Sequence, residues 1–264
     1  MFRRRFSKRP VKGKRNYKRK SYPKKGKGLV TKAQLYRAIA RTAETKQATA
    51  ELVYTRFNAG ITNNSEMYGI LPGLAQGIGA DQRIGDQIRP KKLVVRGYIN
   101  YDCPSNQPAA MIISRMFCFQ PKSFRDYLNK GSVPNTLLTN GANPSAFTGA
   151  LLEITRPQNR EQFTFYKDQK HTFLKPWGYT NTTSPTYITD VTAMDKSLCH
   201  FFTITLTAKQ LPAVLKYNTD GATHPTNFLP LMALGYADAF NASPDTITTK
   251  LGMSWSSTLY YEDA

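Results

Sequence analysis

The most regular pattern along the chain is an alternation of apolar and polar residues at every second position. It is clearest over residues 93–101, where Leu93, Val95, Ile99 and Tyr101 alternate with more polar neighbours such as Arg96. A period of two is typical of a strand that buries one face. Comparable β-prone runs lie at residues 52–57, 111–119, 149–155, 162–167, 171–175, 201–207 (with Phe202, Ile204 and Leu206 on one face), 229–236 and 247–261 (with Leu251, Met253, Trp255 and Leu259). We therefore expect an all-β domain of eight or nine strands.

Long loops rich in Gly, Pro, Asn, Ser and Thr separate these runs, at residues 58–90, 135–145, 179–191 and 217–227. They are far longer than hairpin turns. Eight strands joined by loops of such uneven length fit two facing Greek-key sheets better than an up-and-down barrel. The predicted fold is a single jelly roll, an eight-stranded antiparallel β-sandwich.

Two segments carry helical signals. Ser123 and Asp126 form a capping box, and Gly131 supplies a C-terminal stop, which predicts a short helix within a loop. Nearer the N-terminus, Thr31 is a candidate cap for a helix over residues 32–47, although its apolar stripe is weak. This second segment is equally well interpreted as a frayed linker. The expected organisation is an arm at residues 1–28, a linker or short helix at 29–50 and the jelly roll at 51–264.

Charge is distributed very unevenly over the 264 residues. The chain has 37 Lys plus Arg against 17 Asp plus Glu, a formal net charge of +20. Residues 1–28 hold 14 of these bases and no acid, whereas residues 51–264 hold 19 bases against 16 acids. The basicity thus belongs to one arm attached to a nearly neutral body. An arm with so little apolar content is expected to be disordered or extended on its own.

The arm combines basic clusters with aromatic rings. Cationic side chains neutralise phosphates, and rings stack on unpaired bases, so the combination favours single-stranded nucleic acid. A nuclear localisation signal or a solubilising tail is the alternative, and nuclear targeting is compatible with the same charges. The candidate nucleic-acid-binding residues are Arg3, Arg4, Arg5, Lys8, Arg9, Lys12, Lys14, Arg15, Lys18, Arg19, Lys20, Lys24, Lys25 and Lys27, with Phe2, Phe6, Tyr17 and Tyr22.

Targeting signals and cysteines indicate the cellular compartment in which the protein folds. No apolar segment follows the basic N-terminus, so we expect no secretory signal. The longest apolar run, residues 228–237, contains Pro230 and is about half the length that crosses a bilayer, so no membrane insertion is expected. Cys103, Cys118 and Cys199 have unrelated spacings and are interpreted as small buried hydrophobes in a reducing compartment, without a disulfide framework.

The residues that carry catalysis or bind metals are sparse. His171, His200 and His224 look isolated, and neighbours such as Cys199 and His200 point to opposite faces of a strand, so no metal site is predicted. No hydrolase or zinc motif is present. We expect no cofactor and no enzymatic activity.

Two weaker chemical patterns have structural interpretations that are favoured. The sequence Gly77-x-Gly79 has Gln82 where a dinucleotide-binding fingerprint has its third glycine, so a flexible loop is favoured over a phosphate cradle. Asp102, Glu153 and Asp190 have no spacing that suggests paired catalytic carboxylates.

A polybasic arm of Arg and Lys with Tyr and Phe, joined to one β-rich body, resembles the capsid proteins of small viruses with circular single-stranded DNA genomes. The segment Arg83-Ile-Gly-Asp-Gln-Ile-Arg-Pro-Lys-Lys, continuing to Asn100, looks like the stretch leading into an early jelly-roll strand in circovirus-like capsid proteins. Circoviruses proper often have a denser arginine run, and this arm contains more Lys and Gly, so the resemblance is to the broad group.

The resemblance implies a subunit that self-assembles into an icosahedral (T=1) shell of about 60 copies, with the arm bound to a single-stranded DNA genome. It implies a virion protein that passes through the host nucleus during assembly, with nuclear import receptors and a host cell receptor as further partners. The alternatives are a cellular single-stranded nucleic-acid-binding protein with a basic tail, which would bind through its body, and the coat protein of a small RNA or satellite virus. The choice of DNA over RNA rests on the resemblance alone. A lectin or enzyme with a targeting tail is a third class.

Overall fold

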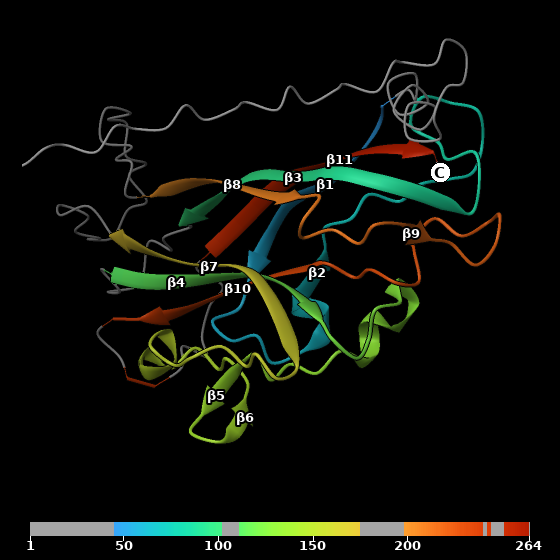
Figure 1. The fold of residues 1–264 in the computed structure, drawn as a ribbon. Coiled ribbons are helices and arrows are strands. Elements are labelled where there is room, and N and C mark those ends of the chain that lie inside the picture. Colours follow the sequence, from blue (N-terminus) through green and yellow to red (C-terminus); the bar gives the residue numbers. More distant parts are fainter. Residues whose placement is uncertain (1–44, 102–110, 175–197, 240–241, 244–250, 264) are drawn as a thin grey trace, which may run out of the picture. The chain divides into compact units, whose positions relative to one another are not determined.

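In the computed structural model, the described residues are 45–101, 111–174, 198–239, 242–243 and 251–263 (Figure 1). They form eleven strands and three short 3-10 helices. All pairings between the strands are antiparallel. The predicted all-β class is confirmed.

Nine of the strands make two sheets that face each other as a β-sandwich. The first sheet has the order β1 (Lys46–Phe57), β11 (Leu251–Asp263), β3 (Gln87–Tyr101) and β8 (Cys199–Thr207), with β9 (Leu215–Lys216) added beside β3. The second has the order β2 (Met67–Gly69), β10 (Leu231–Asp238), β4 (Met111–Pro121) and β7 (Phe163–Leu174). A separate ribbon joins β5 (Leu138–Asn140) to β6 (Asn143–Ser145).

The two sheets differ in what covers their outer faces. Alternate residues of β4 belong to different clusters: Met116 and Cys118 pack in the core between the sheets, while Phe117 and Phe119 pack in a second apolar cluster under the loops. The two central strands of this sheet, β4 and β10, are therefore buried on both sides, which explains their nearly continuous apolar sequences, whereas the edge strand β7 is partly exposed. On β8, in contrast, Phe202, Ile204 and Leu206 are buried, and the residues between them are exposed. The outer face of the five-stranded sheet thus carries exposed side chains and, among the described residues, is not covered by a second apolar cluster.

The predicted strands over residues 93–101, 111–119, 201–207 and the described part of 247–261 are confirmed. Strand β7 is continuous through 162–167 and most of 171–175, which were predicted as separate strands. The strand predicted at residues 149–155 is wrong, because this segment forms the 3-10 helix η3 (Leu151–Ile154). Gly149 enters it with φ of 94°, a left-handed conformation that interrupts an extended chain. The predicted loop at 135–145 contains the β5–β6 ribbon.

The helix predicted after Ser123 begins later and has a different cap. It is the 3-10 helix η2 (Tyr127–Ser132), and the carboxylate of Asp126 accepts a hydrogen bond from the Leu128 amide at 3.0 Å. Gly131 lies inside this helix and does not terminate it. A further 3-10 helix, η1 (Asn64–Glu66), lies in the long loop before β2.

The β-rich body begins at least five residues earlier than residue 51. Lys46 and Gln47, predicted as the end of a helix, are the first residues of β1. The Lys46 ammonium holds the start of this strand in place: its Nζ lies 2.9 Å from Asp263 Oδ2 and donates to the Gln82 carbonyl at 3.0 Å. Most of the predicted helix at 32–47 lies outside the described residues. Within the described part of the chain, no helix is long and apolar enough to span a membrane.

Candidate nucleic-acid interface

All eighteen candidate nucleic-acid-binding residues of the arm, from Phe2 to Lys27, lie outside the described residues. Cys103, Asp102 and Asp190 also lie outside them, as does the predicted loop at 179–191. The described surface nevertheless has one feature that suits a nucleic acid, on the outer face of the five-stranded sheet.

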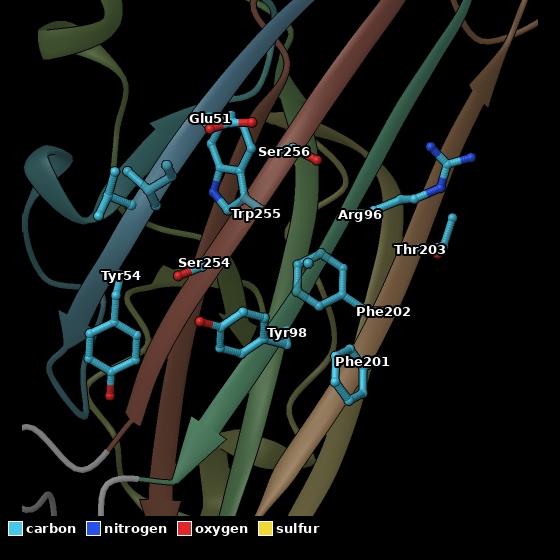
Figure 2. A pocket seen from close by; sticks show the side chains of 13 residues that line it. Glu51, Tyr54, Arg96, Tyr98, Phe201, Phe202, Thr203, Ser254, Trp255 and Ser256 are labelled. Atoms are coloured by element: carbon cyan, nitrogen blue, oxygen red, sulfur yellow. The ribbon is translucent and has the colours of Figure 1, made fainter.

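A hollow of about 650 Å³ lies on this face (Figure 2). We call it the sheet groove. It is formed by residues 51–54 of β1, 96–98 of β3, 201–203 of β8 and 254–256 of β11. Four neighbouring strands of one sheet thus contribute to it, although they are distant in sequence.

Strand register explains why the surface is hollow at this point. Ser254 lies opposite Tyr98, which in turn lies opposite Phe201. One step along, Ser256 lies opposite Arg96, and Arg96 opposite Thr203. Directly opposed residues point to the same face of a sheet, so small serines of β11 form the floor beside larger side chains of β3 and β8.

An irregularity in β1 closes the other side of the groove. The register of β1 with β11 shifts between Leu52 and Thr55, which leaves Val53 and Tyr54 outside the regular ladder. Val53 is 81% exposed. The ring of Tyr54 lies over Gly252, since a Cβ at that glycine would be 2.0 Å from the ring's Cζ. Gly252 therefore provides the space that the tyrosine ring occupies.

The groove is lined by aromatic rings and by the cationic side chain of Arg96. Phe201 is 76% exposed, and its ring centroid is 6.0 Å from that of Tyr98, with the planes tilted by 54°. Arg96 is exposed, and among the described residues nothing forms a hydrogen bond or ion pair with its guanidinium. The acid of the groove is Glu51, opposite Ser256 at the β1 side. The cation and the acid are thus separated by a strand.

Sequence reasoning did not identify this groove. A signal was present, because the alternation that buries Phe202 and Ile204 places Phe201 on the solvent face, where a large aromatic residue is unusual. The pairing of Phe201 with Tyr98 and the position of Arg96 depend on the sheet register, which the local pattern does not specify.

The structure corrects the prediction that all three histidines are isolated. His171 of β7 and His200 of β8 stack with ring centroids 4.0 Å apart, so they join the edge strands of the two sheets. Burial lowers the pKa of both rings, and the neighbouring His200 lowers that of His171 further. His224 stacks on Tyr127 at 3.7 Å instead. Within the described residues, no three His, Cys, Asp or Glu side chains are grouped to hold a metal.

The predicted burial is confirmed for Cys118, which lies in the core, where burial raises the pKa of its thiol to about 12. Cys199 is partly buried, and burial raises its pKa as well. In the glycine-rich loop, the Gly77 amide donates to the Arg83 carbonyl at 2.9 Å and the Gly79 amide to Gln82 Oε1 at 3.0 Å. These amides are occupied within the loop and do not form a phosphate cradle.

The segment that carries the viral resemblance contains a fully buried arginine. The guanidinium of Arg83 donates to the carbonyls of Thr219, Asp220 and Ala222 at 2.8, 3.1 and 3.0 Å, and to the carbonyl of Gly85. It also lies 4.4 Å from the ring centre of Tyr217. The side chain thus links the loop before β3 to the loop after β9, and its role is structural.

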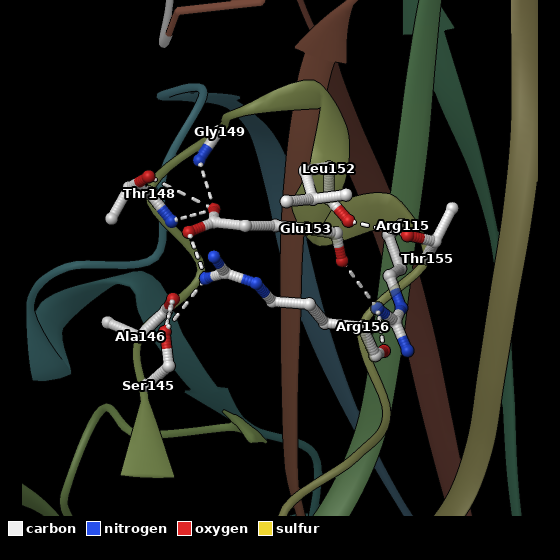
Figure 3. A network of polar contacts seen from close by, with 9 residues as sticks. All are labelled: Arg115, Ser145, Ala146, Thr148, Gly149, Leu152, Glu153, Thr155 and Arg156. Atoms are coloured by element: carbon white, nitrogen blue, oxygen red, sulfur yellow. Dashed lines mark hydrogen bonds and ion pairs between the residues drawn. The ribbon is translucent and has the colours of Figure 1, made fainter. Parts of the chain in front are cut away.

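Glu153, considered as a catalytic carboxylate, also has a structural role (Figure 3). Its Oε2 accepts hydrogen bonds from the Thr148 and Gly149 amides, and its Oε1 is 3.2 Å from Arg156 Nη1. Arg115 donates to the Glu153 carbonyl at 2.7 Å and forms a bidentate pair with Asp168. Although burial raises the pKa of Asp168, hydrogen bonds from Arg115 and Gln158 lower it more, with a net decrease.

Comparison with known proteins identifies no family. No protein-family model matches the chain, and no curated protein matches it either. Function has to be inferred from the strand order, the distribution of charge and the sheet groove.

Proposed function

We propose that the sandwich is a jelly roll. Leaving out the two-residue β9, the other eight strands of the two sheets pair, in chain order, first with last, second with seventh, third with sixth and fourth with fifth: β1–β11, β2–β10, β3–β8 and β4–β7. Wrapping one long antiparallel ribbon around itself produces this nested pairing, and the ladders β11–β3 and β10–β4 complete the two sheets. Double-sheet jelly rolls are found in viral capsid and lectin domains and in cupins.

Among these classes, the chain fits a viral capsid subunit that packages single-stranded DNA. The observation that carries this proposal is the nested strand order, which begins at Lys46 and follows an N-terminal arm (residues 1–28) with 14 basic residues and no acid. The arm supplies charge that neutralises packaged phosphates, whatever their sequence. The body has only three more bases than acids beyond residue 50 (19 against 16), so subunits can pack side by side without strong repulsion.

Assembly would combine two contributions. Contacts between bodies form a closed shell, with loops and sheet edges at the contacts. A nucleic-acid strand then collects many arms on one polymer and raises the effective concentration of the bodies. Added salt weakens the second contribution, because phosphate contacts are lost as counterions are restored.

The sheet groove favours a second candidate, a cellular single-stranded nucleic-acid-binding protein that uses its body as well as its tail. Such a protein would bind oligonucleotides as a monomer or dimer and would form no closed shell. The two candidates therefore differ in particle formation and agree in nucleic-acid binding.

The experiment is negative-stain electron microscopy of the purified protein across a salt series. Absorbance at 260 and 280 nm is recorded for every size fraction, and co-purifying nucleic acid is digested with DNase or RNase. We expect uniform closed shells that hold protected DNA. A discrete monomer or dimer that binds oligonucleotides at every salt concentration would refute the capsid proposal and favour the cellular protein, and sensitivity to RNase alone would indicate an RNA virus.

A deletion of residues 2–28 tests the role of the arm. We expect a folded body that no longer packages nucleic acid. The matched control replaces the six arginines of the arm by lysine, which preserves its charge and should preserve packaging, because phosphate neutralisation depends mainly on charge. Genome-length DNA inside particles of the deleted protein would contradict the proposal.

A further inference from the structure

We propose that the sheet groove binds unpaired bases of single-stranded nucleic acid, with Tyr98 and Phe201 as the stacking surface and Arg96 as the phosphate contact. This inference rests on the proposed nucleic-acid-binding function and extends it from the arm to the body (Figure 2).

The aromatic rings of Phe201 and Tyr98 form a surface on which bases can stack. Phe201 exposes 76% of its surface to solvent, beside the half-buried ring of Tyr98. A large exposed ring on a sheet face is a site where apolar area remains to be buried. Every base has a flat π face, so bases stack on such rings without regard to sequence. This suits a protein that binds a long strand in many registers.

The guanidinium of Arg96 provides a cation beside the aromatic rings. Arg96 and Tyr98 are two residues apart on β3, so they point to the same face about 7 Å apart. A base stacked at Tyr98 thus has its own phosphate within reach of the guanidinium. The hydroxyls of Thr203 and Ser256 lie on either side of Arg96 in the same row. Glu51 at the β1 side repels phosphate, which orients the backbone toward β8.

The composition of the groove disfavours a second copy of the chain as its occupant. Its large exposed apolar side chains are Val53, Tyr54 and Phe201, whereas a stable protein interface buries about 800 Å² on each partner. A protein partner would also bury the guanidinium of Arg96, which has no ion-pair partner among the described residues, and this burial is costly without an acidic group opposite. A nucleotide provides both the flat apolar surface and the anion.

Chain connectivity brings a bound strand to this sheet. Gly28, the last residue of the basic arm, precedes Glu51 of the groove by 23 residues, which is at most about 80 Å of extended chain. A strand bound by the arm is therefore held at high effective concentration around the sheet to which β1 belongs.

The test measures binding of the full chain to two fluorescent oligonucleotides of equal charge, a thymidine strand of about 12 nucleotides and an abasic strand of the same length. Fluorescence anisotropy is recorded at about 0.5 M NaCl, where phosphate contacts are weakened. We expect the base-containing strand to bind at least about fivefold more tightly, because base stacking on an aromatic side chain contributes about 1–3 kcal/mol per base.

Variants assign this difference to the groove. Phe201→Ala removes a stacking ring, and Ser254→Leu fills the floor of the groove. Each should reduce the preference for the base-containing strand. The control Leu128→Ala, at a site outside the groove that is 86% exposed, should retain that preference. Arg96→Ala should weaken both oligonucleotides more than Arg89→Ala, an exposed site on the same strand. Thermal unfolding checks that every variant is folded.

Each other outcome overturns the inference in a distinguishable way. Equal binding of the two oligonucleotides by the wild-type chain would refute stacking in the groove and leave packaging by the arm intact. Loss of particles in Phe201→Ala, with an unchanged preference for bases, would identify the groove as a contact between subunits. Failure of both oligonucleotides to bind in low salt would refute the proposed function itself.

Discussion

Arg83 offers the sharpest test of how the structure is stabilised. Its side chain is fully buried, and its guanidinium holds the carbonyls of residues 219, 220 and 222 against the loop before β3. Substitution by methionine keeps an unbranched apolar stem and removes every donor. The change isolates the hydrogen bonds from the packing of the stem.

The expected loss is about 3 kcal/mol of unfolding free energy. Hydrogen bonds to a charged group contribute about 1.5–3 kcal/mol each, and Arg83 makes four to carbonyls. The loss should be smaller than the sum of these four contributions, because a buried methionine has no charge to desolvate and water can reach part of the loop. The ion-pair partner Asp86 is 58% exposed, so the substitution leaves no carboxylate buried. Because of these offsets, we expect a loss at the lower end of the range of about 3–5 kcal/mol that is typical when a buried charge network is broken.

The assay is urea unfolding in salt that keeps the subunits dissociated, because self-association would stabilise the folded state. For a body of this size, 3 kcal/mol corresponds to a fall of about 6–12 °C in Tm. Hydrogen exchange provides a local readout: amides around residues 217–222 should lose protection before those of β4 do, since Arg83 holds that loop directly.

The control is Arg89→Met, six residues away at an exposed position, where we expect a change within about 0.5 kcal/mol. If the unfolding free energy of Arg83→Met also lies within about 1 kcal/mol of the wild-type value, the hydrogen bonds from Arg83 to the carbonyls do not stabilise the fold, and the reasoning is wrong.

Two other predictions concern stability. Burial lowers the pKa of the stacked pair His171 and His200, so the unfolded chain binds more protons; stability should fall as pH drops below about 6.5 and level off below the lowered pKa values. His200→Gln should flatten this dependence in urea midpoints measured between pH 7.5 and 5.5, and an unchanged slope would exclude the pair as its source. Gly149→Ala should cost about 2–3 kcal/mol in the same assay, because φ is 94° and the new Cβ would lie 2.8 Å from Ala59 Cβ. Gly131→Ala, with open space around it, should be close to neutral, and equal effects at both glycines would contradict this explanation.

Local patterns determined the long strands, because a strand with one buried face repeats that face every second residue, whereas the short strands β2, β5, β6 and β9 were not predicted. This holds for β3, β8 and the described part of β11, and the apolar run of β4 was sufficient despite its two buried faces. The segregation of charge is likewise a property of the sequence alone. Both features depend on residues that are neighbours in the sequence and require no contact with distant segments.

Tertiary contacts decided the rest. Residues 149–155 have the composition of a strand, but the Glu153 carboxylate accepts a hydrogen bond from the Gly149 amide of its own loop, and the segment forms a 3-10 helix. The sheet groove is assembled by four strands whose residues span positions 51–256, and the stack of His171 on His200 joins two sheets. Such contacts depend on which strands pair and in which register, and the free energy that selects them comes from burial between segments far apart in the chain.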